Sequence, residues 1–357
     1  MNTTQAQLRR ESGTLLEVTD LYTHFNTAIG VVKAVDGVSF TLERGRRLGI
    51  VGESGCGKTV LSRSIMGLLP RRNVLRGGEV VFEGQELTTM SLKDRRKIWG
   101  AEMAMIFQDP MTSLNPVMKI GKQIGESLRV HLGMSRSDAR ATVLRLLQDV
   151  GIPEPEKRLD QYAHELSGGM RQRVMIAIAL ACGPAVLFAD EPTTALDVTV
   201  QAQILQLIET QRQDRNMSTI LVTHDLGVVA GHTDDIIVMY AGKVVEKAST
   251  LTLFSKMKMP YTEALFRSIP KLDDHSHTRL TTIGGRPPNL ITPPTGCRFS
   301  PRCPYVTDLC VNEEPPLIEA SPGHSYACHY PVGSDRWQEV NLRQAASSDH
   351  AKAMESI

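Results

Sequence analysis

The chain has 357 residues, of which 41% are hydrophobic and 22% charged, a composition ordinary for globular proteins. Lys and Arg together number 40 and Asp and Glu 39, a balance that argues against a general nucleic-acid-binding protein. No apolar run approaches the about 20 residues that span a bilayer, and the polar start lacks a signal-peptide core. We therefore expect a cytosolic protein without a nucleic-acid partner.

The first part of the chain predicts a flexible tail at 1–14 and then the opening of an α/β domain. Residues 15–25 and 31–45 alternate apolar and polar positions, as two half-buried antiparallel strands do. Residues 46–52 form a short apolar strand that runs into a glycine-rich turn, and residues 58–69 have helical spacing. Strand, loop and helix in this order begin an α/β unit.

Helices replace strands in the middle of the chain. Residues 120–132 and 137–151 space their apolar positions as helices do, and Ser137 is a candidate N-cap of the second helix. A helical subdomain is therefore expected at about 109–170. It interrupts an α/β domain that we expect to span 15–250.

Short apolar strands return after this insertion. Residues 185–192 and 218–225 are nearly continuously apolar, which is typical of a parallel sheet covered on both faces. Residues 235–249 predict a hairpin that turns at Ala241 and Gly242. The proline- and glycine-rich residues 251–331 predict a small irregular C-terminal domain, and residues 332–357 a second flexible tail.

The turn GESGCGKT matches G-x-x-x-x-G-K-[ST] and lies between a strand and a helix, as this phosphate-binding motif requires. Its backbone N–H groups and the helix start would surround phosphate, Lys58 would reach the β- and γ-phosphates, and Thr59 would bind Mg²⁺. The Cys56 side chain has no required role there, although a redox role is open. The predicted ATP-binding residues here are Gly52, Glu53, Ser54, Gly55, Cys56, Gly57, Lys58, Thr59 and Val60.

Two further stretches complete a nucleotide site. Asp190 and Glu191 end an apolar strand, where Asp190 would lie toward Mg²⁺ and Glu191 toward the attacking water, unless both simply form a solvated edge. In LSGGMRQR, the residues Ser167, Gly168, Gly169 and Met170 precede or begin a helix and predict a second anion-binding site. One chain has no evident use for two such sites, but two chains arranged head to tail do.

The order of GESGCGKT, MIFQDP, LSGGMRQR, LFADEPTTALD and LVTHD resembles an ABC-transporter nucleotide-binding subunit over about residues 15–250. This resemblance implies an ABC-type P-loop ATPase fold with a RecA-like core, an antiparallel β subdomain and a helical subdomain. It implies that Gln108 is a catalytic residue that senses the γ-phosphate and binds Mg²⁺ with Thr59 and Asp190. It also implies that His224 is a catalytic residue that contacts the γ-phosphate, and that Asp197 lies at the dimer interface. Phe25 is the predicted adenine-stacking residue, with Tyr22 as the alternative; either ring is also a candidate core residue.

Residues 250–330 resemble the C-terminal region of oligopeptide- and dipeptide-importer ATPase subunits, on KMPYTEALFRSIP, IGGRPPNLITPPTGCRFSPRCPYVTDLC and GHSYAC. The resemblance implies an ATPase that powers peptide import at the cytoplasmic face of the cell membrane. Its implied partners are a paralogous ATPase subunit, two transmembrane permease subunits and an extracytoplasmic peptide-binding protein. The alternatives are an importer ATPase for another solute, such as nickel or a glycoside, and a non-transport ABC ATPase.

Four cysteines cluster in this C-terminal region, namely Cys297, Cys303, Cys310 and Cys328. In a reducing compartment such a cluster favours metal binding over disulfides. The spacing lacks the tight pairs of most zinc sites and also departs from ferredoxin patterns. Four thiolates on longer loops favour a [4Fe–4S] cluster, as the family resemblance also does. Zinc, and disulfides or free thiols, stay open as alternatives.

Overall fold

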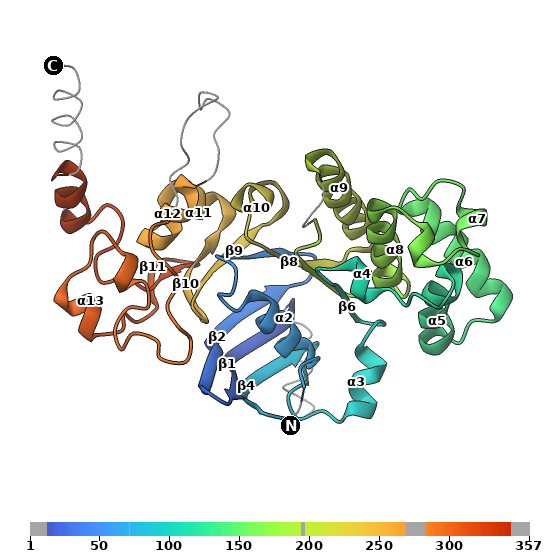
Figure 1. The fold of residues 1–357 in the computed structure, drawn as a ribbon, viewed down its shortest axis with the longest axis horizontal. Helices are drawn as coiled ribbons and strands as arrows, with labels where there is room; N and C mark the ends of the chain where they lie inside the picture. Colours follow the sequence, from blue (N-terminus) through green and yellow to red (C-terminus); the bar gives the residue numbers. More distant parts are fainter. Residues whose placement is uncertain (1–12, 71, 194–196, 269–282, 344–357) are drawn as a thin grey trace, which may run out of the picture.

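The computed structural model describes residues 13–70, 72–193, 197–268 and 283–343, arranged around two sheets (Figure 1). The smaller sheet is antiparallel and confirms the predicted N-terminal strand pair. Its strands, in spatial order, are β2 (Gly30–Glu43), β1 (Thr14–Thr27), β4 (Val74–Phe82) and β5 (Gln85–Glu86).

The larger sheet has eight strands, and its central members are parallel. In spatial order they are β11 (Ile318–Ser321), β12 (His324–Tyr326), β10 (Lys243–Ser249), β9 (Asp235–Tyr240), β3 (Arg47–Val51), β8 (Ser218–Thr223), β7 (Val186–Asp190) and β6 (Met103–Ile106). The predicted apolar strands are thus confirmed as β7 and β8, and the predicted hairpin as antiparallel β9 and β10.

Strand β7 explains why these segments are apolar throughout. All its residues are buried, and alternate side chains enter different cores. Phe188 packs toward the antiparallel sheet and α2 (Lys58–Met66), whereas Leu187 and Ala189 pack with the helices of the opposite face. A strand covered on both faces needs no polar alternation.

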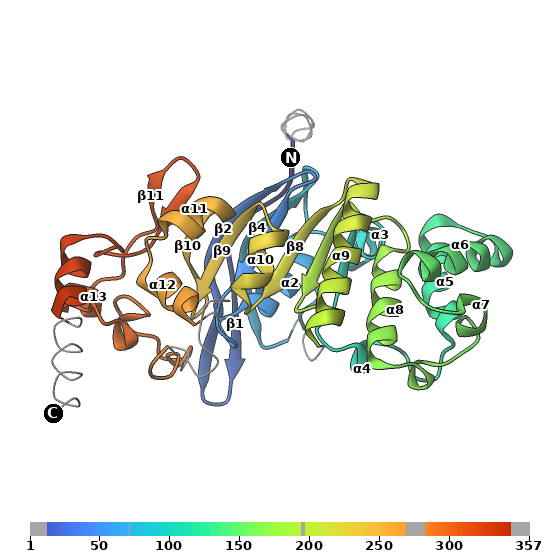
Figure 2. The same cartoon turned by 90° about the horizontal axis from the view of Figure 1, so that it is seen from above.

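The other helices cover the sheet or form the insertion. They are α3 (Leu92–Ile98), α4 (Pro110–Ser113), α5 (Ile120–Leu132), α6 (Arg136–Asp149), α7 (Pro155–Arg158), η1 (Ala163–Glu165), α8 (Gly168–Leu180), α9 (Val198–Arg215), α10 (Leu226–His232), α11 (Thr250–Lys256), α12 (Pro260–Arg267), η2 (Ser300–Arg302) and α13 (Asp308–Asn312). Helices α5 to α7 lie at the end of the molecule opposite α13 (Figures 1 and 2). Within the insertion, the N-cap of α6 is Ser135 rather than Ser137, because the Ser135 hydroxyl accepts the Asp138 N–H.

The C-terminal region continues the large sheet, because β12 pairs with β10. The tail expected at 332–357 is wrong for residues 335–343, which are helical. Trp337 and Asn341 anchor this segment through hydrogen bonds to Glu263 and Tyr305. Residues 344–357 and most of the predicted N-terminal tail lie outside the described residues; Thr14 already begins β1. None of the described helices has both the length and the apolar character to cross a bilayer.

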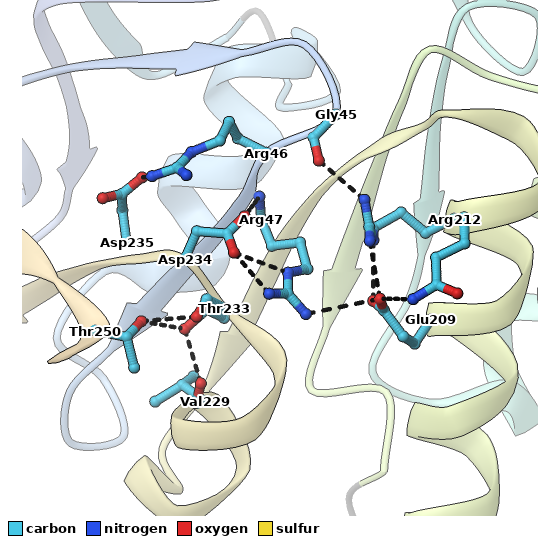
Figure 3. Close-up of polar contacts among 11 residues, drawn as sticks. Gly45, Arg46, Arg47, Glu209, Arg212, Val229, Thr233, Asp234, Asp235 and Thr250 are labelled. Carbon is cyan, nitrogen blue, oxygen red and sulfur yellow. Dashed lines mark hydrogen bonds and ion pairs between the residues drawn. The ribbon is translucent and has the colours of Figure 1, made fainter.

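An ion-pair network joins α9 to the N-terminal ends of strands β3 and β9 (Figure 3). Arg47 donates to Asp234 at 2.6 Å and lies 3.6 Å from Glu209. Glu209 in turn accepts two hydrogen bonds from Arg212, which also donates to the Gly45 carbonyl. These contacts fix α9 against the strand that leads into the phosphate loop.

Candidate nucleotide site

The glycine-rich turn joins β3 to α2 and is tightly enclosed. Gly52 and Gly57 have φ values of 152° and 109°. A Cβ at these positions would approach the Met239 and Ala34 carbonyl oxygens to 2.2 and 2.1 Å. Only glycine fits there, so the spacing of the motif reflects two close backbone approaches. Burial raises the pKa of the Cys56 thiol, which favours the neutral form and gives no support to a redox role.

Lys58 begins α2 with a buried side chain. Its Nζ donates to the carbonyl oxygens of Gly52 at 2.7 Å and Glu53 at 3.1 Å. Both acceptors are uncharged carbonyl groups, so these hydrogen bonds do not neutralise the ammonium. It can therefore still pair with a phosphate.

Thr59 and Asp190 meet across the site, where the Thr59 hydroxyl donates to Asp190 Oδ1 at 2.9 Å. Asp190 is fully buried, and its Oδ2 has no hydrogen-bond partner among the described residues. Burial raises the pKa of this carboxyl. A partly buried hydroxyl and an unsatisfied carboxylate oxygen are hard oxygen donors, so these residues fit Mg²⁺.

Glu191 is held at the ends of three neighbouring parallel strands. Its carboxylate accepts a 2.9 Å hydrogen bond from Gln108 Nε2 and lies 3.4 Å from His224 Nδ1. The three residues follow β6, β7 and β8, whose carboxyl ends share one edge of the sheet. Glu191 also adopts a left-handed conformation, with φ 47°. Such strain in a non-glycine residue persists where the surrounding structure imposes it, often at functional sites.

The second predicted anion site lies at an exposed helix start. Ser167 is the N-cap of α8 and accepts the Met170 N–H at 3.4 Å; Gly168 is exposed and Gly169 partly so. Asp197 caps α9 by accepting the Val200 N–H. A Cβ at Gly169 would lie 3.7 Å from Val200 Cγ1, so the two helix starts are neighbours. Among described residues, no hydrogen bond or ion pair joins this α8 start to loop 52–59.

The predicted adenine-stacking residue lies on the antiparallel sheet. Phe25 pairs with Val32 of β2 and Val74 of β4 and is partly exposed. The Tyr22 ring covers Gly77, where a Cβ would collide with it. Adenine stacking by Phe25 stays a prediction.

The four cysteines form no single-ion site. In the part of the chain that the structure describes, no group of three His, Cys, Asp or Glu side chains could hold a metal ion. The thiols are nevertheless near one another. Burial first, and then the neighbouring cysteines, raise the pKa of Cys303 and Cys328 to about 12. Cys297 N–H donates to the Cys310 carbonyl at 2.8 Å. As neutral thiols, Cys297, Cys303 and Cys328 pack against the main core like small apolar groups.

The sequence did not reveal the residues outside the phosphate loop that form hydrogen bonds with it. Arg302 binds the Glu53 side chain, and Tyr261 binds its backbone. Both come from the C-terminal region. The only signal was two arginines inside GCRFSPRC, and a short motif does not say which carboxylate an arginine reaches.

This combination of sheet, phosphate loop and positioned acid defines an ATP-binding cassette ATPase. The family described as ABC transporter matches residues 35–194, and the family described as the oligopeptide/dipeptide transporter C-terminal region matches residues 245–310. A dimeric ATP-binding cassette solved with ADP and Pi bound is 25% identical, with a TM-score of 0.60, covering 66% of this chain and 99% of that one.

Curated relatives show which group of ATP-binding cassette proteins the chain resembles. The dipeptide transport ATP-binding protein DppD of Escherichia coli is 49% identical, over 89% of this chain and 97% of the relative. The oligopeptide transport ATP-binding protein OppD of Salmonella typhimurium is 46% identical, over 93% and 98%. The chain belongs to the family of ATP-binding subunits of dipeptide and oligopeptide ABC transporters.

Proposed function

We propose that this chain hydrolyses ATP to power the import of dipeptides or oligopeptides across the cytoplasmic membrane. The observation that carries the ATPase part is the Glu191 carboxylate, held by Gln108 and His224 at the strand edge beside the phosphate loop. The peptide part is supported by the C-terminal match at 245–310 and by relatives named for peptide transport.

The residues of the site have separate roles in this proposal. Lys58 and the loop amides bind the phosphates, while Thr59 and Asp190 hold Mg²⁺, which offsets phosphate charge when bound. Glu191 orients and polarises the attacking water. Gln108 and His224 hold Glu191 and report whether a γ-phosphate is present. Phe25 stacks on the adenine.

Hydrolysis takes place in a dimer, with Ser167, Gly168, Gly169 and Met170 closing on the nucleotide of a partner ATPase and Asp197 at the interface. Support comes from the exposed helix starts of α8 and α9 and from the dimeric state of the solved relative. We propose a paralogous ATPase as partner, bound with this chain to two permease subunits at the cytoplasmic face of the membrane. An extracytoplasmic peptide-binding protein would deliver the substrate.

The C-terminal cysteines would hold a [4Fe–4S] cluster in the assembled protein. Four neighbouring sulfur donors on a segment with little regular structure support this proposal. The spacing of the four cysteines, which lacks the tight pairs of most zinc sites, favours a cluster over a single zinc ion. The cluster would order a segment too irregular to build its own core.

The test is reconstitution of the chain with its permeases and partner ATPase in vesicles. ATP-dependent uptake of a labelled dipeptide or oligopeptide is expected, and the Glu191→Gln complex should show none. Uptake of nickel or a glycoside instead of peptides would replace the peptide assignment. ATP hydrolysis without any permease association would favour a non-transport ATPase.

A further inference from the structure

The C-terminal region reaches the phosphate loop through an arginine–glutamate pair. Arg302 donates to both oxygens of the Glu53 carboxylate, at 2.6 Å and 2.9 Å. The two residues are 249 positions apart in the sequence. The Arg302 side chain is only 3% exposed, whereas that of Glu53 is 24% exposed. A bidentate pair of this kind fixes the orientation of both groups.

Contacts other than the pair with Glu53 also hold Arg302 in place. Its guanidinium donates to the Gly284 and Ile283 carbonyls and lies about 6 Å from the Tyr240 and Phe299 ring centres. Hydrogen bonding to Glu53 and then to Tyr240 raises the Arg302 pKa, so the side chain stays charged. The position of this arginine therefore does not depend on Glu53 alone.

The backbone of Glu53 is held from the same side. Its N–H donates to the Tyr261 hydroxyl at 2.8 Å, and Tyr261 is fully buried. The Tyr261 ring packs on Tyr240 and Phe299, with centroid distances of 4.5 and 5.4 Å. The side chain and the backbone amide of Glu53 thus both form hydrogen bonds with residues of the C-terminal region.

The far end of the loop is braced by the same segment through an intermediate turn. Arg298 donates to Asp36 and to the carbonyl of Ala241. Next to it, the Gly242 N–H donates to the carbonyl of Cys56 at 2.8 Å. Arg298 and Arg302 both lie between Cys297 and Cys303, so one seven-residue segment contacts the loop directly at Glu53 and supports the turn that bonds to Cys56.

The contact with Arg302 matters for ATP binding because Glu53 is negatively charged. Glu53 is an acid within a loop whose ligand is a polyanion, and an unpaired carboxylate there would repel the phosphates. Paired with Arg302, it is neutralised and directed toward the C-terminal region, so that it does not offset the charge of the Lys58 ammonium.

We propose that Arg302 is a positioning residue for ATP binding: it holds the Glu53 carboxylate away from the phosphate site, so that the C-terminal region sets the ATP affinity of the loop. The inference rests on the proposed ATPase function and deepens it. Arg302 touches no substrate atom and acts through Glu53.

The test compares Arg302→Ala, Glu53→Gln and the double variant in the full-length chain, using ATP affinity measured with a fluorescent ATP analogue. Arg302→Ala is expected to raise Kd about tenfold, the size of a lost charge-assisted pair, and to lose part of this effect at high salt. The double variant removes the unpaired charge and should return to within about threefold of the wild type. In the assembled transporter, KM for ATP should rise more than kcat falls.

Arg267→Ala is the matched control, because Arg267 forms an exposed pair with Glu263 in the same region and does not contact the loop. It should bind ATP like the wild type. If Arg302→Ala fails to fold, Arg302→Lys replaces it; Lys keeps the charge but cannot donate both bonds in one plane, so Kd should rise about threefold.

Two results would overturn the inference alone: wild-type affinity in Arg302→Ala, or a double variant that binds no better than Arg302→Ala. The second would mean that Arg302 acts only as a structural support. Absence of ATP binding by the wild-type chain would overturn the proposed function together with this inference.

Discussion

The hydroxyl of Thr59 donates a 2.9 Å hydrogen bond to Oδ1 of Asp190, and this bond ties the helix after the phosphate loop to the end of β7. It leaves Oδ2 of the buried carboxylate without a partner among the described residues. A buried polar atom left unsatisfied costs free energy, which a bound cation would recover.

Asp190→Asn should separate Mg²⁺ binding from nucleotide binding. Asparagine keeps the shape and one oxygen but loses the negative charge that a hard divalent cation requires. We expect Mg²⁺ to tighten ATP binding in the wild type and to do so at least about tenfold less in the variant. Titrating ATP with and without Mg²⁺ measures this difference. An equal Mg²⁺ effect in both proteins would exclude Asp190 as a ligand.

Glu191→Gln should stop hydrolysis without stopping binding. The amide can still meet Gln108 at 2.9 Å, but it cannot polarise water, so turnover in the assembled complex should fall by about two to four decades. ATP affinity should change little, and the nucleotide-bound dimer should accumulate. The control is Glu156→Gln on α7, an exposed acid that forms no hydrogen bond or ion pair with Glu191 among the described residues. Near-normal turnover in Glu191→Gln would refute its role.

Ser167→Arg tests whether the site is composite. The isolated chain is expected to hydrolyse ATP poorly, because we propose that the exposed start of α8 acts on the nucleotide of a partner. In the assembled complex the variant should cripple hydrolysis at the partner's phosphate loop and leave ATP binding at Lys58 intact. Site-resolved nucleotide crosslinking distinguishes the two sites. Lost binding at Lys58 with an unaffected partner site would contradict the head-to-tail arrangement.

Short sequence patterns predicted local structure where each motif is one segment: the strand before the phosphate loop, the helix after it and the apolar strands β7 and β8 are all present, while the roles of the site residues stay predictions. Glycine spacing and an acid pair after an apolar strand depend on neighbouring residues, whereas the predicted cap Ser137 was wrong by two positions, since Ser135 caps α6. Contacts between distant segments left no such signal. The pairing of β12 with β10 and the pair of Arg302 with Glu53 join residues many positions apart, and neither is periodic. The helical turns at 335–343 were missed for the same reason, since Trp337 is anchored by the distant Glu263.

The network in Figure 3 predicts a pH-dependent contribution to stability. Hydrogen bonding from Arg212 lowers the pKa of Glu209, so its contribution is complete above the ordinary value of 4.5 and is lost as pH falls through the lowered one. Glu209→Gln leaves Arg47 and Arg212 short of a counter-charge and should reduce the free energy of unfolding by about 1–3 kcal/mol at pH 7. The difference from the wild type should be full at pH 7 and should shrink as the pH falls below 4.5 and through the lowered pKa of Glu209. Chemical denaturation at both pH values measures it; an equal difference at both would contradict the ion-pair account.

The cysteine cluster can be tested by metal content and colour. Protein purified without oxygen should be brown, absorb broadly near about 400 nm and contain about four irons per chain. Cys303→Ser should lose the colour and loosen residues 285–330, because it would remove one of the four proposed ligands from a segment with little regular structure, while the nucleotide site stays folded. Cys182→Ser is the matched control, since Cys182 is half-buried and lies far in sequence from the cluster. Hydrogen exchange across 285–330 reports the loosening, and iron analysis reports the ligand loss. A colourless anaerobic preparation with one zinc per chain would replace the cluster with a four-cysteine zinc site.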